Sequence, residues 1–214
     1  MRVLFIGDVV GEPGCDLVRK VLPGFKRMQG VDFCIINGEN SARGNGITPQ
    51  SCEHLLTSGA DALTGGNHSL RRPEIYRVLE EESGVLLRPF NLHRSAPGKG
   101  LCVLEKRGLR LGVANLMGRI DMDDCENPFD SADAIVPETC KFAFDVLVID
   151  MHRSKGDGHA VLFQRDCPVV GGNHLVWTRG GCMDEAFVNT AIFHSYGQVV
   201  PCAREFGCYS VMAR

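Results

Sequence analysis

The sequence predicts an α/β fold in which mixed β-sheets are flanked by α-helices. Apolar, β-branched runs typical of buried parallel strands alternate with amphipathic, helix-like patterns through about residue 90. A hairpin pattern and a further buried run, Val146–Ile149, follow. With 214 residues, 44% of them hydrophobic, the chain is expected to form a single domain over residues 1–214.

The first elements form a strand-turn-helix unit. Val3–Ile6 is the predicted strand, Gly11–Gly14 a turn, and apolar residues at helical spacing over 17–25 predict an amphipathic helix. Phe33–Ile36 and the shorter Ala62–Thr64 are the next predicted strands. This alternation is typical of a parallel sheet covered by helices.

Proline and threonine mark the next two helices. Thr48 before Pro49 predicts an N-cap and a first helical residue, with the helix ending near Ser58, and Pro73 opens another helix. Leu101–Leu104 and Leu109–Ala114 then flank a glycine-containing turn, as in a β-hairpin.

The later chain is less regular. Residues Asn115 to Asp130 are too polar and broken for a regular element, and we expect this segment to border a functional cleft. Pro168–Val170 and Thr190–Phe193 are predicted short strands, and Gly171–His174 a loop.

Composition restricts the partners and the location. A net charge of -3 leaves no basic excess for an extended nucleic-acid surface. The apolar opening breaks at Gly7-Asp8, and no segment reaches the roughly 20 apolar residues of a membrane span. We therefore expect a cytoplasmic protein without membrane attachment, and leave open whether it forms a homo-oligomer. The ten cysteines contain no Cys-x-x-Cys pair, which argues against a zinc ribbon and favours reduced thiols.

Four strand-like runs end in residues that bind metals in proteins. Asp8, Glu39, Asn67 and His152 each follow such a run. Open sheets bind ligands beyond the carboxyl ends of their strands, so these residues can converge on one cleft. The alternative is that each polar residue only caps a strand or a helix.

The residue types predict a particular chemistry. Carboxylate and amide oxygens with an imidazole nitrogen suit manganese, iron or zinc. Glu39 could bridge two metal ions, which clamp a phosphoryl group and acidify a water for attack. His68 follows Asn67 directly and could protonate the leaving oxygen. The alternative for His68 is an exposed loop residue.

Five segments also resemble those of one family, the YmdB-like metallophosphoesterases. They follow in order along roughly the first 150 residues and are Gly7–Gly14, Asn37–Ala42, Gly66–His68, Asn115–Arg119 and Asn127–Phe129. The resemblance implies a calcineurin-like metallophosphoesterase fold with a di-metal centre often occupied by iron or manganese. It also implies hydrolysis of cyclic-nucleotide phosphodiesters, including 2′,3′-cyclic nucleotides.

By position, the resemblance implies a role for each site residue. Asp8, Glu39 and Asn40 would bind or neighbour one metal, and Glu39 would bridge to a second. Asn67 and His152 would bind that second metal, with His68 as the proton donor. Asn40 enters the site through the resemblance alone.

The chain departs from the family pattern in its last third. The family carries Gly-Thr-His-Thr-His, with one imidazole for each metal, where this chain has Gly171-Gly172-Asn173-His174-Leu175. Leu175 cannot bind a metal. Asn173 could offer its carbonyl oxygen, and a one-residue shift of the loop could bring in His174. Whether two metals or one are retained is left open.

The sequence thus predicts a phosphodiesterase that hydrolyses cyclic-nucleotide or related phosphodiesters with a metal-activated water. Iron or manganese is expected, with zinc or magnesium as alternatives, and the partner is a small phosphodiester or nucleotide. The second hypothesis is a non-catalytic nucleotide or metal sensor with a degraded site. A lipase-like esterase is disfavoured because Val9 takes the place of the serine, and a dinucleotide-binding loop because Asp8 would repel pyrophosphate.

Overall fold

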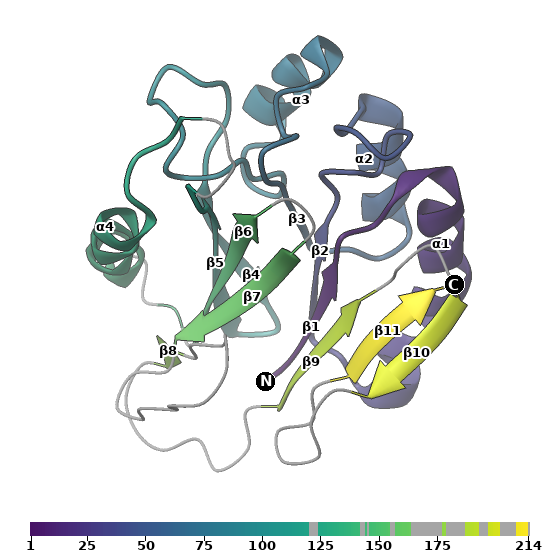
Figure 1. The fold of residues 1–214 in the computed structure, drawn as a ribbon. Helices are drawn as coiled ribbons and strands as arrows, with labels where there is room; N and C mark the ends of the chain where they lie inside the picture. Colours follow the sequence, from purple (N-terminus) through teal and green to yellow (C-terminus); the bar gives the residue numbers. More distant parts are fainter. Residues whose placement is uncertain are drawn as a thin grey trace. The chain divides into compact units, whose positions relative to one another are not determined.

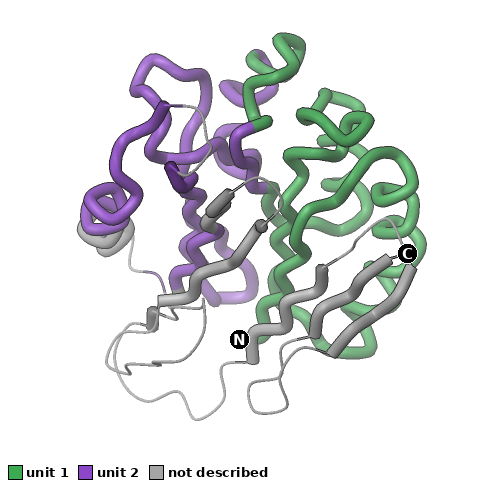
Figure 2. The backbone as a smooth tube through the Cα atoms, viewed as in Figure 1, with its two compact units in different colours: residues 1–63, 68–76, 185–214 green, residues 64–67, 77–184 purple. Residues whose placement is uncertain are grey.

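A computed structural model of the chain describes residues 1–119, 124–141, 144, 146–154, 157–163, 177–178, 187–192, 197–201 and 209–213. Side chains are described up to residue 119 and at 124–135, 141, 144 and 147–150. The chain divides into two compact units (Figure 2). Unit 1 comprises Met1–Leu63, His68–Tyr76 and Glu185–Arg214, and unit 2 comprises Thr64–Asn67 and Arg77–Asp184.

Figure 1 shows the helices and strands in chain order. They are β1 (Arg2–Gly7), α1 (Gly11–Gln29), β2 (Phe33–Asn37), α2 (Pro49–Thr57), β3 (Ala62–Thr64), the 3-10 helix η1 (Pro73–Ile75), α3 (Tyr76–Glu81), β4 (Leu101–Lys106), β5 (Leu109–Met117), α4 (Pro128–Cys140), β6 (Val146–Ser154), β7 (Asp157–Phe163), β8 (Trp177–Thr178), β9 (Phe187–Ile192), β10 (Gly197–Pro201) and β11 (Tyr209–Ala213).

A parallel sheet organises unit 1. Its strand order is β3-β2-β1-β9, and β1 pairs in parallel with both β2 and β9. Every residue of Val3–Ile6 and Phe33–Ile36 is buried, as expected for strands covered on both faces. The predicted strand at Thr190–Phe193 corresponds to β9, which ends at Ile192. Pro168–Val170 lies outside the described residues.

Helix α1 begins earlier than the sequence predicts. The glycine-rich stretch Gly11–Gly14 is not a separate turn but forms the first turn of α1. Pro13 is tolerated there because the first N–H groups of a helix have no intrahelical acceptor. The N–H of Gly14 already bonds to the carbonyl of Val10 at 3.3 Å, so the helix is established by this point.

The helix starts at Thr48 and Pro73 are confirmed. Thr48 caps α2, where its side chain accepts from the N–H of Ser51 and the Ser51 hydroxyl contacts the Thr48 N–H in return. This is a reciprocal capping box. Pro73 opens the short 3-10 helix η1, which runs directly into α3.

Unit 2 is built on a mixed sheet. Strands β4 and β5 form the predicted antiparallel hairpin, β5 and β6 pair in parallel, and β6 and β7 are antiparallel. The hairpin turn has positive φ at Arg107 and Gly108, which suits the right-handed twist of the two strands. Ile135 of α4 packs with β5 and β6 residues to form the core cluster of Ala114, Leu116, Ile135, Phe144, Leu147 and Ile149.

Two boundaries in unit 2 differ from the prediction. The segment from Asn115 to Asp130 is more regular than its sequence predicts, since β5 continues to Met117 and α4 begins at Pro128. β6 extends to Ser154, so Asp150 and His152 lie within the strand rather than beyond it. Pairing with β5 and β7 explains the extension, because each neighbour continues the hydrogen-bonded register through His152.

Among the described helices, none combines the length and apolar character needed to cross a bilayer.

Gly100 in unit 2 packs directly against the backbone of Phe90, so a substitution there tests how closely this part of the unit is packed. A Cβ at Gly100 would overlap the Cα of Phe90 and lie 2.6 Å from its nitrogen, whereas a Cβ at Gly84 would meet nothing within 4 Å. We expect Gly100→Ala to lower the free energy of unfolding by about 1–3 kcal/mol because the backbone must shift. The control Gly84→Ala should change it by less than about 0.5 kcal/mol. Urea denaturation measures both, and equal effects would contradict the packing described.

Candidate active site

The loops after β1 and β2 meet in unit 1. The N–H of Val9 donates to the carbonyl of Asn37 at 3.0 Å, and the N–H of Gly11 donates to the carbonyl of Asn40 at 2.9 Å. Neighbouring parallel strands end at the same edge of a sheet, so residues that follow them are brought together. Asp8 and Asn40 are therefore placed beside each other by backbone hydrogen bonds.

Asn40 connects Asp8 to His68. Its Nδ2 donates to Asp8 Oδ1 at 2.7 Å, and its Oδ1 lies 2.6 Å from His68 Nδ1. A carboxylate only accepts hydrogen bonds, so the amide nitrogen must face Asp8 and the amide oxygen must face His68. His68 Nδ1 then carries a proton.

Glu39 is a buried carboxylate in the same cluster. Its residue exposure is 1%, and Oε2 accepts from the backbone N–H of His68 at 3.1 Å. Its own N–H donates to Asn37 Oδ1 at 3.2 Å. Burying a carboxylate is costly unless it is hydrogen-bonded or binds a metal. Asp8, Glu39, Asn40 and His68 thus form one cluster, called here the strand-end cluster.

A second buried polar group lies in unit 2 and joins three strands. The Thr64 hydroxyl donates to Asp150 Oδ2 at 2.5 Å, and Asn115 Nδ2 donates to the carbonyls of Gly65 and Asp150 at 3.0 and 3.3 Å. The N–H of Gly65 returns a bond to Asn115 Oδ1 at 3.2 Å. Thr64, Asn115 and Asp150 are all at most 1% exposed. We call these residues the buried polar network.

This network supports the segments that carry two predicted ligands. Asn67, 9% exposed, follows Gly65 by two residues, and His152 follows Asp150 by two residues in β6. The sequence motifs include Asn115 but do not predict its place in this network. The sequence sign of that place is a polar residue inside the apolar run that forms β5.

The predicted site residues fall into three groups. The strand-end cluster lies in unit 1, whereas Asn67 and His152 belong to unit 2, where only the backbone of His152 is described. Asn173 and His174 lie outside the described residues.

The donor set suits a hard metal ion. Within the described part of the chain, no group of three or more His, Cys, Asp or Glu side chains could hold a metal. The predicted ligand set differs from such a group, because it combines the carboxylates of Asp8 and Glu39 with the side-chain oxygens of asparagines, which are not among these four residue types. Such oxygen ligands fit magnesium or manganese, and an added imidazole favours iron or zinc. The buried, hydrogen-bonded carboxylate of Glu39 is consistent with this fit.

The fold is that of an α/β metallophosphoesterase, as in a solved phosphatase of 27% identity. The model of the family described as YmdB-like protein matches residues 4–170, and the chain belongs to this family. The resemblance found in the sequence motifs is thereby confirmed.

Characterised and solved relatives agree with this membership. A 2′,3′-cyclic-nucleotide 2′-phosphodiesterase from Bacillus subtilis is 41% identical over 152 residues, which cover 71% of this chain and 57% of that protein. The chain therefore spans little more than half the length of this relative. A protein from Thermus thermophilus is similar in structure over 100% of this chain and 75% of its own, with a TM-score of 0.67 and 29% identity. A phosphatase from Mycoplasma pneumoniae covers 70% and 54%, with a TM-score of 0.62 and 27% identity.

Two buried asparagines in unit 2 allow a matched test of the polar network. Asn91 Oδ1 accepts from the N–H of Met117 at 2.9 Å, just as Asn115 Oδ1 accepts from that of Gly65. We expect Asn115→Ala to speed amide hydrogen exchange at Gly65 and leave Met117 protected, because only one acceptor is lost. Asn91→Ala should do the reverse.

Each asparagine variant should also lose about 1–3 kcal/mol of unfolding free energy, since a buried donor is left without an acceptor. Exchange monitored by NMR or mass spectrometry gives the local effect. Unchanged protection at Gly65 in Asn115→Ala would contradict the network.

Proposed function

We propose that the protein is a metal-dependent phosphodiesterase that hydrolyses 2′,3′-cyclic nucleotides or related small phosphodiesters. The observation that carries the proposal is the strand-end cluster, in which two carboxylates and a histidine are linked through Asn40 and the His68 backbone. Family membership and the activity named for the Bacillus relative support it. A cytoplasmic location and a possible homo-oligomer remain predictions from the sequence.

The proposed metal centre uses residues from the whole chain. Its ligands are Asp8, Glu39, Asn40, Asn67 and His152, with Asn173 and His174 from the altered loop. Iron or manganese is the expected content, at two positions or, if the altered loop supplies no ligand, at one. A bound ion of this kind supplies Lewis-acid activation of a water and of the phosphate.

His68 is the proposed proton donor to the leaving oxygen. Its Nδ1 is held by Asn40 Oδ1, so Nε2 is the ring atom that can hold the transferred proton. The bond from the His68 N–H to Glu39 fixes the backbone at the same residue. The residue is therefore held at two points before substrate arrives, which favours a positioned acid.

The metal role of Asp8 can be tested against a matched aspartate. We expect Asp8→Asn to lose bound metal and about 100-fold or more in hydrolysis of 2′,3′-cyclic AMP, because a charged ligand is replaced. Asp16→Asn is the control, since the Asp16 side chain is 64% exposed and lies on α1, and it should keep both properties. Elemental analysis and the hydrolysis rate are the measurements.

Full metal content and activity in Asp8→Asn would contradict the assignment. Wild-type protein that holds no transition metal, and regains none with manganese, would instead favour the sensor hypothesis.

The acid role of His68 predicts a dependence on the leaving group. His68→Ala should keep its metal but hydrolyse 2′,3′-cyclic AMP about 10²–10⁴-fold more slowly, because an alkoxide must leave without a proton. The loss should be much smaller for bis-p-nitrophenyl phosphate, whose leaving group needs no protonation. His93→Ala, which removes a histidine that contacts Ser95, is the control. Equal losses for the two substrates would rule out a proton donor at this position.

A further inference from the structure

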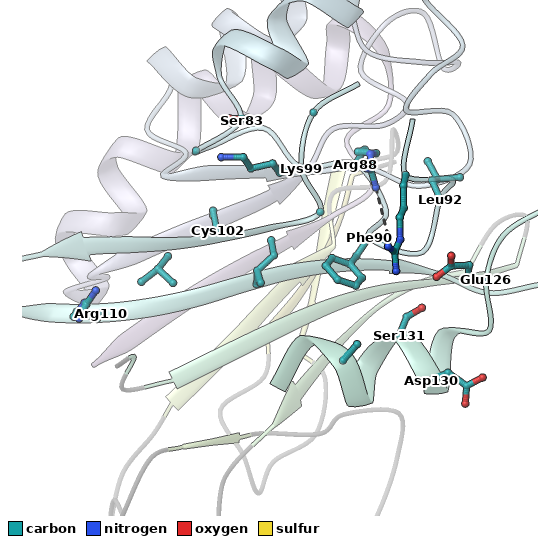
Figure 3. Close-up of a pocket in the computed structure, with 17 residues that line it drawn as sticks. Ser83, Arg88, Phe90, Leu92, Lys99, Cys102, Arg110, Glu126, Asp130 and Ser131 are labelled. Carbon is teal, nitrogen blue, oxygen red and sulfur yellow. Dashed lines mark hydrogen bonds between the residues drawn. The ribbon is translucent and has the colours of Figure 1, made fainter. Parts of the chain in front are cut away.

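Unit 2 contains a cavity of about 900 Å³, and none of the proposed active-site residues whose side chains are described line it. We propose that this cavity binds a small organic anion, consisting of an apolar body with a carboxylate or phosphate head group. Figure 3 shows Lys99 on one side of the cavity and Ser131 and Asp130, on α4, on the other. Its size lies within the range of about 300–1,000 Å³ typical of small-molecule sites.

The cavity offers an apolar surface to the body of the ligand. Phe90, Leu92, Leu101 and Val103 line it, and each keeps part of its surface accessible. Phe90 and Leu101 also pack against the core cluster, so this wall is anchored to the sheet. Apolar and aromatic side chains of this kind are usual in the lining of a ligand pocket.

The charged side chains around the cavity favour an anion. Among the described residues that line it are four cations, Arg88, Arg94, Lys99 and Arg110, and two carboxylates, Glu126 and Asp130. Arg110 has a carboxylate partner in Glu105 at 3.5 Å. Both carboxylates are exposed to solvent, as are Arg94 and Lys99, so the charges of these four groups are screened. The buried Arg88 therefore contributes the least screened charge.

Arg88 is the cation most in need of a counter-charge. It is only 7% exposed, and its guanidinium donates to carbonyls, from Nη1 to Pro89 at 2.7 Å and from Nη2 to Ala96 at 3.5 Å. Among the described residues, no carboxylate bonds to this guanidinium and its Nε has no partner. Burial lowers the pKa of Arg88, against the opposing charge of Glu80. An anion near this group would offset the cost of burying it.

Ser131 provides a second polar group for the head group of the ligand. The residue is 4% exposed, and its N–H is used within the first turn of α4, where it bonds to the carbonyl of Asn127 at 3.0 Å. The Ser131 hydroxyl makes no hydrogen bond to another described residue. The Ser131 side chain lines the cavity (Figure 3). A hydroxyl so placed can donate to a carboxylate or phosphate oxygen.

The test uses a fluorescent apolar anion, 1-anilinonaphthalene-8-sulfonate, bound to the whole chain. Octanoate and octyl phosphate should displace it at least about tenfold more effectively than 1-octanol, since charge-assisted hydrogen bonds contribute about 1.5–3 kcal/mol. Displacement by only one of the two anions would identify the head group. Octanol as effective as both anions would overturn the proposal.

Variants locate the binding. Arg88→Met should weaken octanoate or octyl phosphate about tenfold and leave octanol unchanged, whereas Arg107→Met, at an exposed arginine of the hairpin turn, should change neither. If circular dichroism shows that Arg88→Met does not fold, Lys99→Met, at an exposed lysine, should weaken binding of the anions about threefold.

A bulky side chain tests the same cavity sterically. Ala134→Trp, from an exposed position of α4 that lines the cavity, should weaken binding of all three ligands. Binding that is absent in wild type, or insensitive to the lysine and alanine variants, would refute the site.

Discussion

The parallel pairing of β1 with β2 determines where the chemically active side chains of unit 1 lie. Once Val3–Ile6 is in register with Phe33–Ile36, the segments that follow both strands leave the sheet at one edge. The bonds from Val9 to Asn37 and from Gly11 to Asn40 then fix the two loops to each other. The strand-end cluster depends on this pairing, because neither loop contains the cluster by itself.

The cost of burying polar groups explains the rest of the arrangement. Glu39 is buried and accepts from the backbone N–H of His68, and Asn40 uses both ends of its amide to join a carboxylate to an imidazole. In unit 2, Thr64, Asn115 and Asp150 bond to one another across three strands. Hydrogen-bonded buried networks rigidify their surroundings, which suits segments that carry proposed metal ligands.

Much of the fold could be predicted from the sequence because its signals are local. The capping residue Thr48, the proline at 73 and the hairpin around Gly108 all act within a few residues. The start of α1 could not be predicted in this way, since Gly and Pro suit a turn and a first helical turn equally well. The extent of β6 could not be predicted either, because pairing with β5 and β7 decides it rather than its own composition.

The candidate site was predictable only in part, for a similar reason. Asp8, Glu39 and His68 follow apolar runs and could be recognised by their positions, while the bridging role of Asn40 requires partners 28 and 32 residues away. The bonds of Asn115 and Asp150 could not be predicted, because their partners lie in other segments of the chain. Arg88 and Ser131 become informative only when their burial is known.

We propose that the strand-end cluster holds a metal ion. Crystals soaked with manganese and measured near its absorption edge test this directly through the anomalous difference map. We expect a peak about 2 Å from a carboxylate oxygen of Asp8, with Glu39 in the same coordination shell. Well-ordered Asp8 and Glu39 carboxylates without an adjacent peak, at saturating manganese, would contradict it.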